Sequence, residues 1–259
     1  MNTADLPLLT GQSTDVSFSD WLIAARESGA AALIDKQTGW TSFDVVAKLR
    51  SLTRIRKIGH AGTLDPLATG LLIVCLGRAT KRIEEFQKLD KHYSATIKLG
   101  ATTPTDDAEM PEEHLKDTAG ISEHDIATAA QHFSGLIEQI PPTFSAIKSA
   151  GRPFYKAARR GEAVAPPSRT VQIYSITVKK VSLPVVEIEV HCGKGTYIRS
   201  LARDIGAALG CGGYLASLRR AAIGDYTVEN AVTIDIIKEY AGRYAESQQH
   251  EHIITDGNT

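Results

Sequence analysis

Hydrophobic residues recur along the chain at two spacings, and each spacing predicts a different kind of element. Continuous apolar stretches at Ala31–Ile34 and Leu71–Leu76 predict short strands, and the second is typical of a strand covered on both faces. Apolar residues at every second position of Tyr93–Leu99 predict a strand buried on one face. Two further strands are predicted over Val171–Val181 and Val185–His191.

Helical spacing appears in three other stretches. Thr41 and Asp44 stand at the spacing of a capping box before an apolar run, and Ser122 and Asp125 repeat that signal. A third helix is predicted after a Gly-Lys-Gly turn and ends at Gly210. Residues 57–70, rich in Gly, Thr and Pro, predict a loop. Strands and helices do not alternate regularly, which favours an α+β fold with a mixed sheet. The apolar positions of the three helices are Val45, Val46, Leu49 and Leu52; Ile126, Ala129 and Phe133; and Ile198, Leu201, Ala202, Ile205 and Leu209.

Composition narrows the class of protein. The chain has 259 residues, of which 42% are hydrophobic and 23% charged, as in ordinary globular proteins. No apolar run approaches the roughly 18–20 residues of a membrane span, and the first basic residue is Arg26, which predicts no secretory leader. Three cysteines without a C-x-x-C pair indicate neither a disulfide framework nor a zinc site. We therefore expect a cytoplasmic protein that does not bind membranes.

The net charge of −1 conceals a segregation of charge. The window from Thr105 to Asp125, predicted as a surface loop, carries a net −7, which leaves +6 on the remainder of the chain. Clustered basic residues on a nearly neutral protein indicate a surface that binds phosphates, although solvated helix faces would give the same pattern. The two purely basic stretches contain Lys48, Arg50, Arg54, Arg56 and Lys57, and Lys148, Arg152, Lys156, Arg159 and Arg160.

The segment Gly59–Gly70 holds the strongest candidate for chemistry. Its three glycines permit positive φ and close approach of a ligand to the backbone. Pro66 disfavours a helical conformation at Asp65, so the carboxylate sits on an extended or turned backbone. Taken alone, the pattern is more often that of an ordinary Asp-Pro turn, and His60 is more often a turn residue than a functional one.

This segment resembles the signature loop of the TruB-type tRNA pseudouridine-55 synthases, and further motifs follow in the order of that family. The resemblance covers roughly residues 31–235. It implies a pseudouridine synthase catalytic fold, which is a mixed, mainly antiparallel central sheet with flanking helices and loops. The matching residues are Leu33-Ile34-Asp35-Lys36 with Gly39, Thr41 and Ser42; Asp90-Lys91 with Tyr93; Ile140-Pro141-Pro142 with Ser145, Ala146, Lys148 and Tyr155; His191-Cys192 with Lys194-Gly195-Thr196-Tyr197-Ile198-Arg199; and Leu218-Arg219-Arg220.

The resemblance implies an enzyme that isomerises uridine 55 in the T-arm loop of tRNA. Asp65 corresponds to the essential carboxylate, and Arg199 to the arginine that pairs with it and lowers its pKa. Tyr93 corresponds to a tyrosine that stacks on the flipped base and also acts in catalysis. The product is an isomer of the substrate, so no cofactor and no metal are required. The remaining implied contacts are Tyr197 and Leu218 in the pocket, His60 in the space left by the base, Lys36 beneath the loop, and Lys148, Arg152, Lys156, Arg159 and Arg160 on RNA.

The resemblance also implies a division of the chain. Residues 1–30 form an extension without an assigned role, residues 31–240 the catalytic domain with a basic RNA-binding insertion at about 140–165, and residues 241–259 a short polar tail. Many family members carry a C-terminal RNA-binding PUA-type domain, for which the tail is too short. The sequence departs from the family at Gln37, where Pro is usual, and at Met110, where Gly is usual. In the acidic loop it reads Thr103-Pro104-Thr105-Asp106-Asp107 instead of Thr-Asp-Thr-x-Asp.

Two other classes of function compete with this interpretation. An RNA chaperone that binds tRNA would share the basic surfaces, but it would not need Asp65, Tyr93 and Arg199 together. A glycosidase-like hydrolase would need two carboxylates flanking a bond, and the sequence has no second carboxylate in these motifs. The expected partner is therefore the T stem-loop of tRNA, with no obligate protein partner.

Overall fold

The protein is described by a computed structural model that covers residues 6–144, 148–149, 152–153 and 167–256. The chain divides into two compact units: unit 1 comprises Met1–Leu89 and Arg220–Thr259, and unit 2 comprises Asp90–Arg219. The boundary falls inside strand β11 (Gly213–Ile223), which begins in unit 2 and ends in unit 1.

Unit 1 is built on strands β2 (Ala30–Lys36) and β4 (Thr69–Leu76), which pair antiparallel from Ala30 opposite Leu76 to Lys36 opposite Gly70. Strand β1 (Leu8–Leu9) pairs parallel with β2, and β3 (Ile58–His60) pairs antiparallel with β4. Because β2 and β4 are almost entirely buried, they form the centre of the hydrophobic core. The remaining elements of unit 1 are α1 (Asp15–Glu27), α2 (Ser42–Thr53), a 3-10 turn (Gly77–Arg82), α3 (Ile83–Lys88), β12 (Tyr226–Thr227), a second 3-10 turn (Val228–Asn230) and α7 (Ile234–Asp256).

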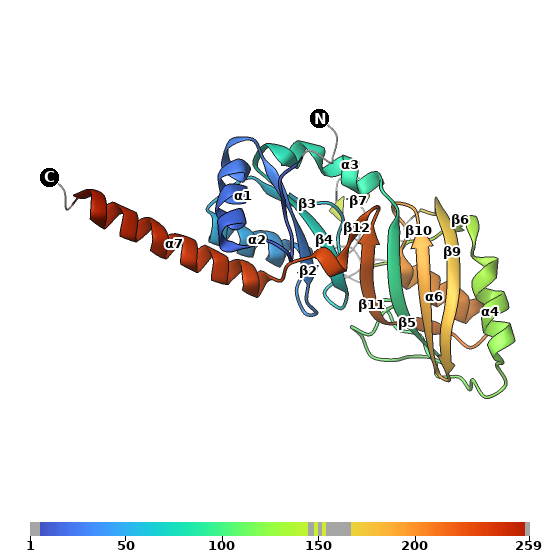
Figure 1. The fold of residues 1–259 in the computed structure, drawn as a ribbon. Coiled ribbons are helices and arrows are strands. Elements are labelled where there is room, and N and C mark those ends of the chain that lie inside the picture. Colours follow the sequence, from blue (N-terminus) through green and yellow to red (C-terminus); the bar gives the residue numbers. More distant parts are fainter. Residues whose placement is uncertain (1–5, 145–147, 150–151, 154–166, 257–259) are drawn as a thin grey trace. The chain divides into compact units, whose positions relative to one another are not determined.

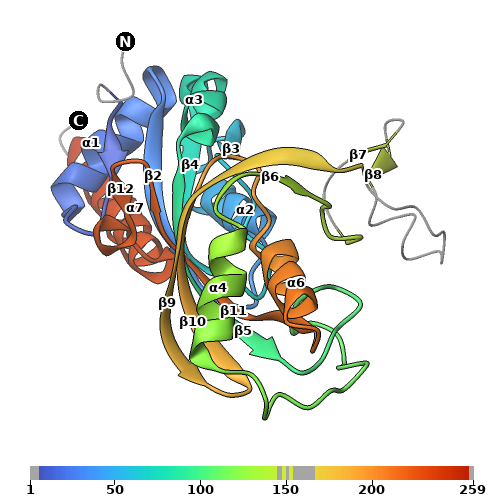
Figure 2. The ribbon, with the colours of Figure 1, turned by 90° about the vertical axis from the view of Figure 1, so that its right-hand side faces the viewer.

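The N-terminal and C-terminal helices of unit 1 lie side by side (Figures 1 and 2). The Phe18 ring on α1 contacts both Trp21, with centroids 5.7 Å apart, and Tyr240 on α7, with centroids 5.5 Å apart. The Trp21 indole N–H donates to the Ala31 carbonyl on β2 at 2.8 Å. Residues 15–27, for which the sequence predicts no role, therefore belong to the core of unit 1. Beyond residue 240, α7 continues as a helix to Asp256.

Unit 2 contains an antiparallel sheet in the order β6-β9-β10-β5, followed by the N-terminal part of β11. Helices α4 and α6 contact each other and cover one face of this sheet (Figure 2). Alternate residues of β5, including Tyr93, Ala95 and Ile97, are buried, and the residues between them are more exposed. The bounds are β5 (Lys91–Leu99), α4 (Glu123–His132), β6 (Gly135–Gln139), β7 (Lys148–Ser149), β8 (Arg152–Pro153), β9 (Arg169–Ser182), β10 (Val185–Cys192) and α6 (Ile198–Ala208).

The α+β class, the mainly antiparallel sheet and the flanking helices are as predicted. Both capping boxes form, at Thr41 with Asp44 and at Ser122 with Asp125. The prediction of a continuous loop over residues 57–70 is wrong at Ile58–His60, because the backbone there pairs with the buried strand β4. It is also wrong at Thr69 and Gly70, which form the start of β4. Among the described helices, none combines the length and apolar character needed to cross a membrane.

Candidate active site

The loop that carries Asp65 is fixed by the start of helix α2. The Ser42 hydroxyl accepts a hydrogen bond from the Leu64 N–H at 2.8 Å and donates one to the Leu64 carbonyl at 3.1 Å. Ser42 and Leu64 are both buried, and Asp65 itself is half-buried. The Asp65 carbonyl accepts from the Ala68 N–H at 3.1 Å, which closes a tight turn over Pro66. Both backbone groups of Leu64, the residue before Asp65, are therefore hydrogen-bonded to the Ser42 hydroxyl.

Arg220 holds the other side of this loop. Its side chain is 2% exposed and donates to the Leu71 carbonyl at 2.7 Å, the Gly62 carbonyl at 3.2 Å and the Thr63 carbonyl at 3.4 Å. Gly70 has a φ of +98°, and a Cβ there would lie 2.4 Å from the Arg220 carbonyl oxygen. Glycine is thus required at the end of the loop, where two backbone segments come together. The sequence gives Arg220 no role, because its contacts depend on the course of β11.

Lys36 and His60 also lie in unit 1. Lys36 is 1% exposed, and its ammonium donates to the Gln37 carbonyl at 3.0 Å and the Trp40 carbonyl at 2.5 Å. The turn that it holds contacts the loop that carries Asp65, since the Gly39 N–H donates to the Pro66 carbonyl at 2.8 Å. His60, on β3, is partly buried, and burial lowers the pKa of its imidazole. A neutral ring in this position suits contact with uncharged groups.

Unit 2 contains the other predicted site residues. Tyr93 on β5 and Leu218 on β11 are each 9% exposed and lie on neighbouring strands. Tyr197 precedes α6, and both its backbone groups bond to the Gln139 side chain, which accepts from the N–H at 2.8 Å and donates to the carbonyl at 3.0 Å. The Arg169 guanidinium lies 4.4 Å from the centre of the Tyr197 ring, a cation–π contact.

Arg199, on the first turn of α6, lies in a buried polar cluster. Its guanidinium is 3.4 Å from the Asp107 carboxylate, and the two side chains are 6% and 2% exposed. It also donates to the Thr105 and Phe144 carbonyls, each at 3.1 Å. Asp107 is held in turn by the Thr105 hydroxyl at 2.6 Å. The ion pair orients Arg199 and offsets part of the cost of burying its charge.

This cluster corrects the prediction of a surface loop over 105–125. Most of that window is exposed, but Thr105 and Asp107 are buried, because they meet α6. Asp106 pairs with Arg203 at 2.9 Å, although burial raises its pKa. Sequence reasoning missed Asp107 as a functional candidate. The one signal for it is the family's pattern of Thr, Thr and Asp, which Thr103, Thr105 and Asp107 retain.

The predicted residues therefore fall into two groups. Lys36, His60 and Asp65 lie in unit 1, and Tyr93, Tyr197, Arg199 and Leu218 lie in unit 2. The pairing of Arg199 with Asp65 stays a prediction. Of the predicted RNA-binding residues, Lys148 and Arg152 lie in the paired two-residue strands β7 and β8, and Lys156, Arg159 and Arg160 lie outside the described residues.

Comparison with known proteins gives consistent matches over most of the chain. Residues 50–198 match the profile of the TruB family pseudouridylate synthase (N terminal domain), and residues 199–255 match the tRNA pseudouridylate synthase B C-terminal domain. The chain is 49% identical to the tRNA pseudouridine synthase B of Chlorobium chlorochromatii over 216 residues, which is 82% of this chain and 85% of that protein. It is 44% identical to the protein of the same name from Phocaeicola vulgatus, over 89% of this chain and 99% of that protein.

Solved structures show a similar fold. The chain superimposes on the archaeal box H/ACA sRNP Nop10–Cbf5 complex with a TM-score of 0.65 and 28% identity, over 88% of this chain and 58% of that one. An H/ACA RNP bound to a substrate RNA containing 2'-deoxyuridine gives a TM-score of 0.65 and 27% identity, over 88% and 57% of the two chains. The chain thus spans less than two thirds of the chains that it matches in these structures.

Proposed function

Since the chain belongs to the TruB family of pseudouridylate synthases, we propose that it converts uridine 55 in the T-arm loop of tRNA to pseudouridine. The reaction breaks the N1 glycosidic bond, turns the uracil and joins its C5 to the same sugar carbon. The hydrogen on C5 is lost to solvent, and one proton is taken up at nitrogen. Substrate and product are isomers, so the reaction consumes no second substrate.

The main observation behind this proposal is that hydrogen bonds fix the backbone of the loop that carries Asp65. Ser42, Arg220 and the turn at Gly39 each bind backbone groups within one to six residues of the carboxylate. A reacting group must be held within fractions of an ångström to act efficiently. A protein that only bound RNA would have no need to fix one carboxylate in this way, which argues against the chaperone alternative.

Asp65 acts in the proposal as an ionised carboxylate at the sugar and base of the target uridine. Arg199 keeps that carboxylate charged, because a neighbouring guanidinium lowers an aspartate pKa by about 1–3 units. The bonds of Arg199 to Thr105 and Phe144 fix the plane of the guanidinium. Its fork geometry supports bidentate contact, which a lysine cannot provide.

Tyr93, Tyr197 and Leu218 hold the uracil in this scheme, after the nucleotide leaves its stack. Extruding a stacked base costs a few kcal/mol, and stacking on an aromatic ring recovers about 1–3 kcal/mol per base. Tyr93 lies on a regular strand and is only 9% exposed, so the packing around it limits how far its ring can reorient. His60 fills the space that the base leaves, and Lys36 supports the loop from beneath.

The test uses T-arm RNA that carries tritium at C5 of its uracils. Formation of the new carbon–carbon bond must expel tritium from the target uridine, so the full-length protein should release one tritium per RNA molecule. Matched RNA with cytidine in place of the target uridine should release none. Binding of the T-arm RNA without any release of tritium would overturn the proposal and favour the chaperone alternative.

A further inference from the structure

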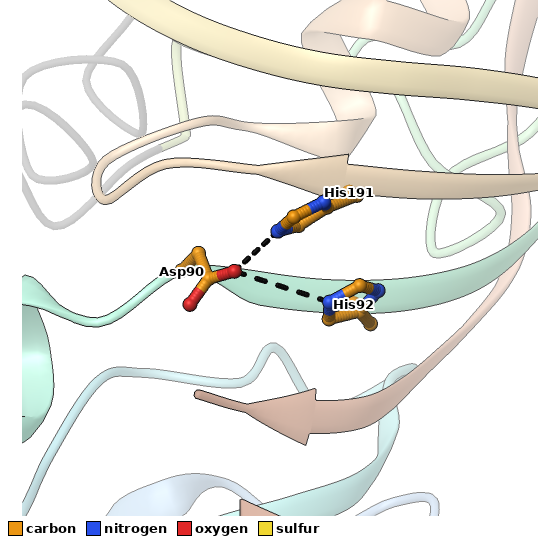
Figure 3. A group of neighbouring side chains, drawn as sticks. All are labelled: Asp90, His92 and His191. Atoms are coloured by element: carbon orange, nitrogen blue, oxygen red, sulfur yellow. Dashed lines mark hydrogen bonds and ion pairs between the residues drawn. The ribbon is translucent and has the colours of Figure 1, made fainter. Parts of the chain in front are cut away.

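Three residues of unit 2 that the proposed reaction does not use form a cluster of potential metal ligands. They are Asp90, His92 and His191, and their ligand atoms all lie within 4.8 Å of one another. Both imidazole Nε2 atoms point toward Oδ2 of Asp90, as Figure 3 shows. His191 hydrogen-bonds that oxygen, and His92 Nε2 lies 3.9 Å from it.

Strand geometry explains why these residues meet. His92 and His191 are directly opposite each other in the antiparallel ladder between β5 and β10, so their side chains project from the same face. Asp90 precedes His92 by two residues, which places it on that face as well. The two rings stack with centroids 3.9 Å apart and an angle of 15°. The register of one strand pair therefore assembles the cluster.

The cluster lies on the solvent side of the sheet. Tyr93 and Cys192, the neighbours of these histidines along the two strands, are buried, whereas the histidines project the other way. The side chains of His92, Asp90 and His191 are 48%, 34% and 30% exposed. A cation can therefore reach all three ligands from solvent, and water can complete its coordination.

We propose that Asp90, His92 and His191 form a binding site for Zn²⁺. Two imidazole nitrogens and one carboxylate oxygen are a ligand set that zinc accepts in proteins, with a solvent ligand in the remaining position. Zinc–ligand bonds of about 2.0–2.2 Å in a tetrahedron place ligand atoms about 3.3 Å apart. To reach that spacing, His92 and Asp90 must move closer than 3.9 Å and the hydrogen-bonded pair of His191 and Asp90 must move apart. The two stacked rings must also tilt so that their Nε2 lone pairs converge on the ion.

A bound ion would add a side-chain cross-link to the backbone pairing of β5 and β10, on the face opposite Tyr93. Asp90 and His191 belong to two motifs of the chain, yet the proposed reaction gives neither a role. The proposal departs from the expectation from sequence that the protein holds no zinc site. Nearly a hundred residues separate His92 from His191, so a search for closely spaced ligands does not find it.

The test is titration of the full-length protein, made without a polyhistidine tag and stripped with a chelator. Isothermal calorimetry should show one Zn²⁺ per chain, and Co²⁺ used as a probe should give a visible absorption band. Asp90→Asn and His92→Gln should each weaken Zn²⁺ binding at least about tenfold, since even outer-shell changes at metal sites cost 10–100-fold. Zn²⁺ should raise the melting temperature of the parent but not of either variant.

His124→Ala serves as the matched control, because His124 is an exposed histidine on α4. This variant should bind Zn²⁺ as the parent does. His92→Gln keeps the test valid if Asp90→Asn fails to fold, because nearly half of the His92 side chain is exposed. Equal Zn²⁺ affinity in the parent and in His92→Gln, or no binding by the parent, would overturn the proposal and leave a hydrogen-bonded cluster.

Discussion

Asp65 owes its position to residues that lie far from it in the sequence. Ser42 is 22 residues away along the chain from Leu64, and Arg220 is 149 residues away from Leu71, yet both bind backbone groups of the loop or its flanking strand. The glycines and the Asp-Pro pair mark this loop in the sequence as a candidate for chemistry. The sequence cannot predict these contacts, because they depend on how β11 and α2 lie against β4.

Arg220→Lys should lower turnover more than it lowers affinity for tRNA. A lysine carries its donors on one nitrogen and cannot span the three carbonyls that Arg220 binds through three separate nitrogens. Each buried acceptor left unsatisfied costs about 1–3 kcal/mol. Single-turnover rates, RNA binding and thermal unfolding would be measured together. Arg219→Lys is the control for stability, since Arg219 is exposed on the same strand. A normal turnover rate in Arg220→Lys would show that the loop does not need this support.

Asp107→Asn should destabilise the protein and reduce turnover through Arg199. Removing one partner of a buried ion pair typically costs about 3–5 kcal/mol, since it leaves the other charge without compensation. The asparagine keeps the shape of the side chain and can still bind the Thr105 hydroxyl. Urea unfolding and tritium release report the two effects. Asp117→Asn, an exposed residue of the same acidic window, should change neither, and equal behaviour of the two variants would contradict the role of the pair.

At the scale of elements, local signals in the sequence predict some structures well. The capping residues of α2 and α4 act within a few positions, and β5 shows its alternation directly, so all three were predicted. Helix α1 was missed, because its buried face is made only where Phe18 and Trp21 meet β2 and α7. The same limit applies to Asp107, which is buried only through its contact with α6.

Trp21→Ala should show that α1 is part of the folded core. Truncation of a buried tryptophan costs about 3–5 kcal/mol, and here it also leaves the Ala31 carbonyl without its indole donor. Equilibrium unfolding in urea would measure the loss. Val16→Ala, on the exposed side of the same helix, should change stability little. A comparably small effect of Trp21→Ala would contradict this role for α1.

The basic segment between β6 and β9 should supply much of the electrostatic contribution to RNA binding. Each phosphate contact contributes about 0.7–0.9 to the slope of log affinity against log salt concentration. Replacing Arg152, Lys156, Arg159 and Arg160 with Ala should reduce that slope by roughly two to three units if most of them reach phosphates. The comparison is made by filter binding at several salt concentrations. An unchanged slope would mean that these side chains only keep the surface solvated.

At the scale of the whole molecule, the family motifs are distributed over both units. The N-terminal profile of the family matches residues 50–198 and the C-terminal profile residues 199–255, whereas the compact units divide at Asp90 and Arg220. The irregular order of strands and helices predicts the α+β class, and the short motifs indicate the family. The sequence does not predict that residues from Arg220 onward complete unit 1, because this depends on the course of β11.

The measurement that tests the central claim most directly compares Asp65→Asn with the parent protein. T-arm RNA labelled with tritium at C5 is mixed with excess enzyme, and tritium release and RNA binding are followed in the same samples. The asparagine keeps the shape of the side chain but removes its charge, so release should cease while affinity stays within a few-fold. Release within tenfold of the parent rate would contradict Asp65 as the catalytic carboxylate.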